Sequence, residues 1–496
     1  MKPSFILHHL TCCLLCTGAW ASDLTGTWKA DLLRRGDVHQ PLYLVLRQSG
    51  ERIDGRVIAP AGGDLPMIDP HFESGDVVFS TKYGMNYRLR PDGESLGVTV
   101  RYEWRDTDVT TATRVAESET SPPAKIPLPV LQELSPNGLA MTPPMGWNSW
   151  NHFGEYIDDR TVREIADALV NSGMATAGYV YVNIDDTWEG DRDANGKISP
   201  NGKFPDMKGL ADYLHKRGLK LGIYSSPGVL TCAGYAGSFG HEEQDAQTFA
   251  EWGVDYLKYD WCSAGQTYSI AERRASCQRM GEALLRCGRP IVYSLSESSP
   301  GSEVWIWGPL AGANLWRTTG DIHDNWAEMS EIGFNQDRFA SFARPGYWND
   351  PDMLEVGNGG MTGTEYRTHF SLWCLLAAPL LAGNDLRSMP ADSLAILTNP
   401  ELIAVDQDVL GRQGTRRLSR EGIEVWTKPL HDGSLALGIF NRSAQAREAK
   451  LTWADLGLAS PPGKVRDLWA RCDQAVAKDG LVGTIPAHGV IALRIK

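Results

Sequence analysis

Between residues 142 and about 415, the sequence alternates short apolar runs with stretches of helical periodicity. The run "YVYVNI" (179–184) has the β-branched and aromatic composition of a buried strand, whereas "TVREIADALVNSG" (161–173) repeats apolar residues at the spacing of one helix face. We count eight strand–helix units over about 270 residues, the size and alternation of a (β/α)8 barrel of the α/β class. A doubly wound open sheet has the same local alternation, so the count of eight favours the barrel.

Acidic residues follow most of the predicted barrel strands, which are 145–150, 179–184, 219–224, 254–259, 290–295, 313–319, 346–350 and 379–383. The acids at these strand ends are Asp185, Asp186, Asp260, Glu297, Asp321, Asp350 and Asp352. In a barrel the C-terminal strand ends surround one mouth, where active sites are built. A single acid there is usually a solvated loop residue, but acids at five strand ends favour a functional site.

Two of these acids have a basic residue close by in the sequence. Lys258 lies two positions before Asp260 on one predicted strand, so both side chains project from the same face. A nearby cation favours an ionised carboxylate. Arg317 precedes Asp321 by four positions. Two carboxylates on either side of a sugar can cleave its glycosidic bond, one as nucleophile and one as general acid/base. Structural ion pairs are the alternative explanation.

The sequence predicts neither a metal nor a cofactor. Clustered carboxylates suit Ca²⁺ or Mg²⁺, but no EF-hand spacing is present and no His/Cys cluster has the spacing of a zinc site. The net charge of −13, with no basic patch, argues against a nucleic-acid or anionic-membrane partner. No segment after the N-terminus is long and apolar enough to span a membrane.

The barrel is expected to lie between two β domains. Residues 1–21 have the apolar stretch and small-residue cleavage pattern of a signal peptide, which predicts a secreted or periplasmic protein. Residues 22–117 alternate apolar and polar positions in short runs and predict an antiparallel N-terminal β domain, followed by a Pro-rich linker at 118–138. The predicted catalytic barrel covers 139–415, and short strands at 416–496 predict a C-terminal antiparallel β-sandwich.

In their order along the chain, several of these segments resemble glycoside hydrolase family 27, the α-galactosidase and α-N-acetylgalactosaminidase family. The matching motifs are "TPPMGWNSWN" (142–151), "YVNIDDTW" (181–188), "LGIYSSPG" (221–228), "TCAGYAGSFGHEEQDAQTFAEWGVDYLKYDWC" (231–262), "WRTTGDI" (316–322) and "WNDPDML" (348–354). The resemblance covers about residues 140 to 415 and is highly specific. It implies an enzyme that hydrolyses terminal α-galactose from a carbohydrate, and it says nothing about 22–116.

The resemblance also implies roles for individual residues. Asp260 corresponds to the nucleophile and Asp321 to the acid/base of a retaining double displacement. The residues expected to contact the sugar are Trp150, Asp185, Asp186, Tyr224, Cys232, Lys258, Glu297, Arg317 and Asp352. Among these, Asp185 and Asp186 are expected on the C4 and C6 hydroxyls. Cys232 and Cys262 match the family's disulfide, and their cystine is expected to line the pocket.

The sequence departs from the family pattern near the fifth strand. Ser296 and Ala313 stand where the family often has a second disulfide, and Ser298 replaces an aromatic residue near the sugar's C2. A relative that cleaves α-N-acetylgalactosamine or β-L-arabinopyranose therefore remains an alternative, although Glu297 suits a C2 hydroxyl and Asp186 favours galactose. A non-catalytic sugar-binding protein is less favoured, because both catalytic acids are present. Cys277 and Cys287 share one predicted helix and are about 15 Å apart, too far to bond to each other.

Overall fold

The computed structural model describes residues 23–59, 63–82, 84–102, 107–121, 123–298 and 301–496 of the chain. The predicted signal peptide lies outside the described residues. The chain divides into two compact units. The first is formed by most of residues 23–121. The second contains the chain from residue 123 to Lys496 and also the segment Leu33–Gln40. Among the described residues, no helix has both the length and the apolar character that a membrane crossing requires.

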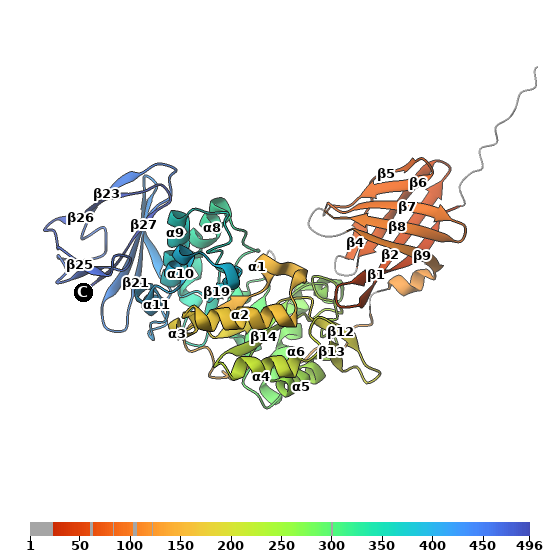
Figure 1. Ribbon diagram of the computed structural model, residues 1–496, viewed down its shortest axis with the longest axis horizontal. Coiled ribbons are helices and arrows are strands. Elements are labelled where there is room, and N and C mark those ends of the chain that lie inside the picture. Colours follow the sequence, from red (N-terminus) through yellow and green to blue (C-terminus); the bar gives the residue numbers. More distant parts are fainter. Residues whose placement is uncertain (1–22, 60–62, 83, 103–106, 122, 299–300) are drawn as a thin grey trace, which may run out of the picture. The chain divides into compact units, whose positions relative to one another are not determined.

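The first unit is built on a nine-stranded antiparallel sheet, coloured red to orange in Figure 1, with the order β4-β3-β2-β1-β9-β8-β7-β6-β5. Its elements are β1 (Gly26–Arg34), β2 (Val38–Ser49), β3 (Arg52–Ala59), β4 (Gly63–Pro66), β5 (Ile68–Glu73), β6 (Asp76–Ser80), β7 (Asn86–Asp92), β8 (Ser95–Arg101), β9 (Asp108–Val115) and the 3-10 helix η1 (Glu117–Thr120). Alternation decides which face is buried: in β8, Leu96, Val98 and Val100 are buried between more exposed neighbours. The antiparallel β architecture predicted for this region is confirmed.

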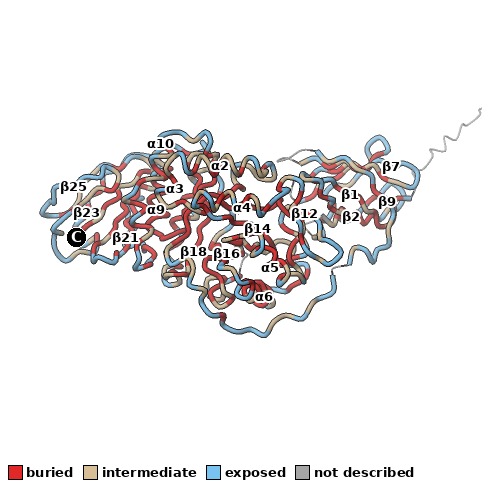
Figure 2. The backbone as a smooth tube through the Cα atoms, turned by 60° about the horizontal axis from the view of Figure 1, so that its bottom comes forward, coloured by how far each residue is buried: buried red, intermediate tan, exposed pale blue. Residues whose placement is uncertain are grey.

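The predicted eight-stranded parallel sheet is confirmed, with the order β18-β17-β16-β15-β14-β11-β10-β19. The strands are β10 (Met145–Asn148), β11 (Tyr181–Asn183), β14 (Lys220–Ser225), β15 (Tyr256–Asp260), β16 (Val292–Ser296), β17 (Leu315–Arg317), β18 (Trp348–Asp350) and β19 (Leu380–Ala382). A parallel bridge between Leu354 and Ala382 connects the two ends of this order, so the strands form a ring. Figure 2 shows β14, β16 and β18 as mainly buried.

Helices and short connecting elements surround the ring. The helices are α1 (Trp150–Phe153), α2 (Asp159–Asn171), α3 (Met174–Ala177), α4 (Met207–His215), α5 (Glu242–Trp252), α6 (Arg273–Arg286), α7 (Val304–Trp307), α8 (Trp326–Phe334), α9 (Gly363–Leu376), α10 (Ala391–Leu397) and α11 (Pro400–Asp406). The other elements are the hairpin β12 (Glu189–Arg192) and β13 (Ile198–Pro200), and the 3-10 helices η2 (Gly154–Tyr156), η3 (Ala264–Gln266), η4 (Ile270–Glu272), η5 (Pro309–Ala311), η6 (Gln336–Phe342) and η7 (Leu386–Ser388).

Local sequence explains where the helix α2 begins and which of its faces is buried. The Asp158 side chain accepts a hydrogen bond from Thr161 N, which satisfies one of the free N–H groups at the helix start. Its buried residues are Val162, Ile165, Ala166 and Leu169. Val170, an apolar residue of the same helix, is 37% exposed, because it lies at the edge of the buried face.

The C-terminal region contains a six-stranded sheet of order β20-β21-β22-β27-β24-β25 and a separate pair β23-β26. Its strands are β20 (Thr415–Arg420), β21 (Ile423–Pro429), β22 (Leu435–Asn441), β23 (Arg447–Thr452), β24 (Val465–Asp467), β25 (Cys472–Gln474), β26 (Gly480–Ile485) and β27 (Val490–Ile495). Val425 and Ile439 of the large sheet share one buried cluster with Leu451 and Ile485 of the pair. Two sheets with a common core match the predicted β-sandwich, and α9 packs against β22 and β27.

Candidate active site

The strand register aligns several predicted site residues on one side of the barrel wall. Lys258 of β15 lies opposite Tyr224 of β14, and Asp260 lies opposite Ser296 of β16. Residues that lie opposite each other in a sheet project from the same face, and so do positions two apart on one strand. Lys258 and Asp260 therefore share a face with Tyr224 at the C-terminal end of the strands.

The first charged cluster surrounds Lys258. Its ammonium group lies 2.8 Å from Asp185 Oδ2 and 5.3 Å from the centre of the Tyr224 ring. Asp185 is also fixed by Asn148, whose Nδ2 donates to the same oxygen at 2.8 Å. The neighbouring Asp260 accepts a hydrogen bond from Trp261 N at 2.8 Å on its Oδ1. The structure therefore brings Asp185, Tyr224, Lys258 and Asp260 together.

The second charged cluster surrounds Arg317. Its Nη2 lies 3.0 Å from Asp352 Oδ2 and 3.1 Å from Asp321 Oδ1. The Asp352 side chain is 5% exposed, whereas that of Asp321 is 76% exposed. Arg317 also donates to Gly320 O at 2.6 Å, and Ile322 N donates to Asp352 Oδ2 at 2.8 Å. Arg317 and Asp352 thus hold the backbone on both sides of Asp321, while its carboxylate remains accessible.

The two candidate catalytic carboxyl groups have opposite pKa shifts. Burial raises the pKa of Asp260 to about 6, although the positive charge of Lys258 opposes this effect. Desolvation by the surrounding mouth residues acts in the same direction on the exposed Asp321, but the charges of Arg317 and Lys258 outweigh it and lower the pKa of that carboxyl. The negative charge of Asp321 in turn contributes to the raised pKa of Asp260, so the two groups interact electrostatically.

The expected disulfide between Cys232 and Cys262 is present, with Cα atoms 4.8 Å apart. Tyr224 lies against it, with its hydroxyl 3.9 Å from Cys262 Sγ. Asp260 and the two sulfur atoms lie within 4.8 Å of one another, but sulfur atoms joined in a disulfide are not thiolate ligands, so this group does not suit a metal. The remaining described cysteines are free, and the prediction that Cys277 and Cys287 do not pair is confirmed.

Trp150 and Asp186 lie shortly after the ends of barrel strands. Trp150 begins α1 directly after β10, and its backbone N donates to Asn148 Oδ1 at 2.9 Å. Asp186 is 1% exposed and accepts hydrogen bonds from backbone N–H groups on both carboxylate oxygens. Asn148 was not singled out from the sequence, although a polar residue at the end of the strand "MGWN" signals a position at the mouth.

The described ion pair of Glu297 is with a helix outside the barrel sheet. Glu297 follows Ser296, the residue opposite Asp260, so strand alternation directs its side chain to the other face, toward the helices. Its Oε2 lies 3.0 Å from Arg273 Nη1 of α6, and the two side chains are only 1% and 5% exposed. The structure therefore places Glu297 in a buried ion pair with the helix layer.

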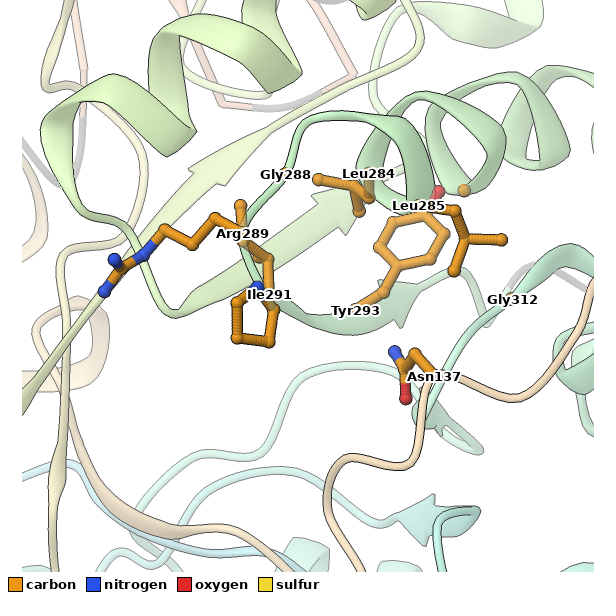
Figure 3. Close-up of a pocket in the computed structure, with 10 residues that line it drawn as sticks. Asn137, Leu284, Leu285, Gly288, Arg289, Ile291, Tyr293 and Gly312 are labelled. Atoms are coloured by element: carbon orange, nitrogen blue, oxygen red, sulfur yellow. The ribbon is translucent and has the colours of Figure 1, made fainter.

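A separate cavity of about 240 Å3 lies at the opposite end of the barrel wall, shown in Figure 3. Arg289, Ile291 and Tyr293, at the start of β16, line it together with Asn137 and the last turn of α6. Because the carboxylates are at the other ends of the strands, this cavity is distinct from the candidate active site.

The fold and the site together define a glycoside hydrolase built on a (β/α)8 barrel. A family model described as alpha galactosidase A matches residues 142–408. A second, the alpha galactosidase C-terminal beta sandwich domain, matches residues 420–495. The chain belongs to the α-galactosidase family.

Individual relatives cover most of the chain. An α-galactosidase from Cyamopsis tetragonoloba is 50% identical over 364 residues, which are 72% of this chain and 87% of the relative. The crystal structure of α-galactosidase I from Mortierella vinacea has a TM-score of 0.69 at 35% identity, over 73% of this chain and 98% of that chain. A crystal structure of a candidate α-galactosidase/melibiase from Bacteroides fragilis has a TM-score of 0.70 at 34% identity, over 95% of this chain and 91% of that chain.

Proposed function

We propose that this chain is a retaining exo-glycosidase that hydrolyses terminal α-D-galactosyl residues of oligo- or polysaccharides. The observation that carries the proposal is the pair of acids at the barrel mouth, Asp260 beside Lys258 and Asp321 beside Arg317, in a member of the α-galactosidase family. Export through the predicted signal peptide at residues 1–21 belongs to the same proposal.

The proposed reaction is a double displacement. The Asp260 carboxylate attacks the sugar's C1, the bond from C1 to the leaving oxygen breaks, and Asp321 gives its proton to that oxygen. Water then attacks C1 of the glycosyl-enzyme, Asp321 accepts its proton, and Asp260 leaves as a carboxylate. Two inversions at C1 give α-galactose as the first product.

The sugar contacts remain proposals. Asp185, held by Lys258 and Asn148, offers a carboxylate with a fixed orientation to a sugar hydroxyl, and Asp186 is held by backbone N–H groups. The other residues in this proposal are Trp150, Tyr224, Arg317, Asp352 and the cystine at Cys232. Glu297 can contact the sugar only if the bound sugar displaces its carboxylate from Arg273.

Ser296 favours a second candidate function, cleavage of α-N-acetylgalactosamine. It lies opposite Asp260 in the strand register, and Ser298, two positions further on, stands where the family resemblance implies an aromatic residue near the sugar's C2. The test is a hydrolysis panel of nitrophenyl α-galactoside, α-N-acetylgalactosaminide and β-L-arabinopyranoside. We expect the highest kcat/KM on the α-galactoside; a higher value on either other substrate would reassign the specificity. Sugar binding without turnover of any of the three would indicate a non-catalytic protein.

A further inference from the structure

The carboxylate of Asp186 is held by two backbone groups. Thr187 N donates to Asp186 Oδ1 at 2.7 Å, and Ala233 N donates to Asp186 Oδ2 at 2.7 Å. Each carboxylate oxygen has a further lone pair for a sugar hydroxyl. The orientation of this carboxylate therefore depends on where these two N–H groups point.

Thr187 has an unusual backbone conformation. Its φ is +85°, in the left-handed region that β-branched residues rarely adopt. Such a conformation persists only where surrounding contacts over-determine it, and such residues cluster at functional sites. The contacts that hold Thr187 are therefore part of what aims the Asp186 carboxylate.

Polar groups of buried or half-buried residues contact every polar atom of Thr187. Its N–H is shared between Asp186 and Glu189 Oε2, the latter at 3.0 Å, and its carbonyl accepts from Asn201 Nδ2 at 2.9 Å. Its hydroxyl accepts from Lys203 Nζ at 2.7 Å, and the same ammonium group donates to Glu155 O at 3.0 Å. Glu189 is fully buried, and burial lowers the pKa of Lys203 to about 8, so Lys203 remains a donor at neutral pH.

We infer that Lys203 and Glu189 are positioning residues for sugar binding, because they hold Thr187 in the conformation that aims its N–H at Asp186. Lys203 fixes the hydroxyl of Thr187 and Glu189 fixes its N–H. Neither side chain needs to touch the sugar. This inference rests on the proposed function, in which Asp186 binds a sugar hydroxyl.

The first test replaces Lys203 by methionine, which keeps the chain length and removes the donor. We expect Lys203→Met to raise KM for nitrophenyl α-galactoside and the inhibition constant of galactose about 10- to 100-fold, the range for a lost hydrogen bond to a charged group. The matched control is Lys197→Met, in the turn of the β12–β13 hairpin that precedes Lys203, where Lys197 forms an exposed ion pair with Glu251. The control should keep both constants.

A second readout separates positioning from general destabilisation. β-L-arabinopyranoside lacks the hydroxymethyl carbon of galactose, so it makes fewer contacts that a misaligned Asp186 can lose. Lys203→Met should therefore reduce kcat/KM more for the α-galactoside than for the arabinopyranoside. Equal losses on both substrates, at a temperature where the variant is fully folded, would overturn the inference.

Variants of Thr187 test the same contact from the other side and serve if Lys203→Met does not fold. Thr187→Ser keeps the hydroxyl and should retain KM, whereas Thr187→Val removes it and should reproduce the Lys203→Met effect. Combining Thr187→Val with Lys203→Met should add nothing further, because both remove one contact. Additive losses, or equal KM values for the Ser and Val variants, would refute the role of Lys203.

Two variants of Glu189 test its role separately. Glu189→Gln keeps an oxygen acceptor for Thr187 N and should preserve KM, whereas Glu189→Leu removes the acceptor and should raise it. Unchanged KM in the leucine variant would remove Glu189 from the inference. Failure of the proposed function is a different outcome, since the unmodified chain would then hydrolyse no α-galactoside at all.

Discussion

The Asp260 side and the Asp321 side of the mouth contain similar groups with opposite electrostatic results. Each carboxyl group has a cation nearby, yet the pKa of Asp260 is raised to about 6 and that of Asp321 is lowered. Lys258 lies 2.8 Å from Asp185, so its charge is shared, and Asp260 is half-buried. Asp321 is 76% exposed and lies 3.1 Å from Arg317. Desolvation acts on both carboxyl groups, but it outweighs the cation at Asp260, whereas the charges of Arg317 and Lys258 outweigh it at Asp321.

For the proposed reaction, this difference implies that substrate binding raises the pKa of Asp321. A general acid must be protonated, but Asp321 is ionised in the free enzyme because its pKa is lowered. A sugar that covers its exposed side chain removes water and raises the pKa. In the proposed reaction, esterification of Asp260 removes its negative charge, so the pKa of Asp321 falls again and Asp321 can act as a base.

The largest expected effect comes from Asp260→Asn. The amide cannot form the glycosyl-enzyme, so we expect kcat for nitrophenyl α-galactoside to fall on the order of 10⁴-fold or more. Galactose should still bind, which isothermal calorimetry measures. Asp212→Asn, at an exposed position on α4, is the surface control and should keep full activity. An active Asp260→Asn variant would assign the nucleophile to another residue.

The next largest effect is expected for Asp321→Asn. Loss of the proton donor should reduce kcat/KM about 10²- to 10⁴-fold on substrates with poor leaving groups such as raffinose-type oligosaccharides. Dinitrophenyl α-galactoside needs no protonation of its leaving group, so the first step should be nearly unaffected. Added azide should restore turnover by attacking the glycosyl-enzyme without a base. Equal losses on good and poor leaving groups would contradict the acid/base role.

The sequence predicts the barrel and most of the mouth because parallel strands place their C-terminal ends together. Once the strands are located in the sequence, Asp185, Asp260 and Asp352 are predicted to lie at the mouth. Boundaries were less predictable: the expected strand 313–319 is β17 at Leu315–Arg317. A strand end also separates neighbouring residues: Ser296 lies opposite Asp260, whereas the adjacent Glu297 pairs with Arg273 of the helix layer.

The raised pKa of Asp260 was also beyond the sequence. Lys258 was expected to hold this carboxyl ionised, and its charge does act in that direction. The larger opposing effect is burial, which depends on side chains distant in the sequence. The contact of Lys203 with Thr187 is likewise set by the fold, because no motif connects these two positions.

A smaller effect should follow from Lys258→Met, and it appears as a shift in pH dependence. The nucleophile must be ionised, so kcat/KM should fall as the pH drops below about 6 in the unmodified enzyme. The positive charge of Lys258 lowers the pKa of Asp260, and its removal must raise that pKa further. The acid limb of the profile should therefore move to higher pH. A limb that stays in place would show that Lys258 does not act on the nucleophile.

The smallest effect on turnover is expected for Glu297→Gln, which tests whether this acid belongs to the mouth or to the helix layer. Because Glu297 pairs with the buried Arg273 on α6, the substitution should leave KM within about threefold while the free energy of unfolding falls by about 3 kcal/mol. Urea denaturation measures the second quantity. Arg273→Met should lower stability similarly and also spare KM, because the two substitutions break one ion pair from opposite sides. A tenfold rise in KM for Glu297→Gln with unchanged stability would instead place its carboxylate on the sugar.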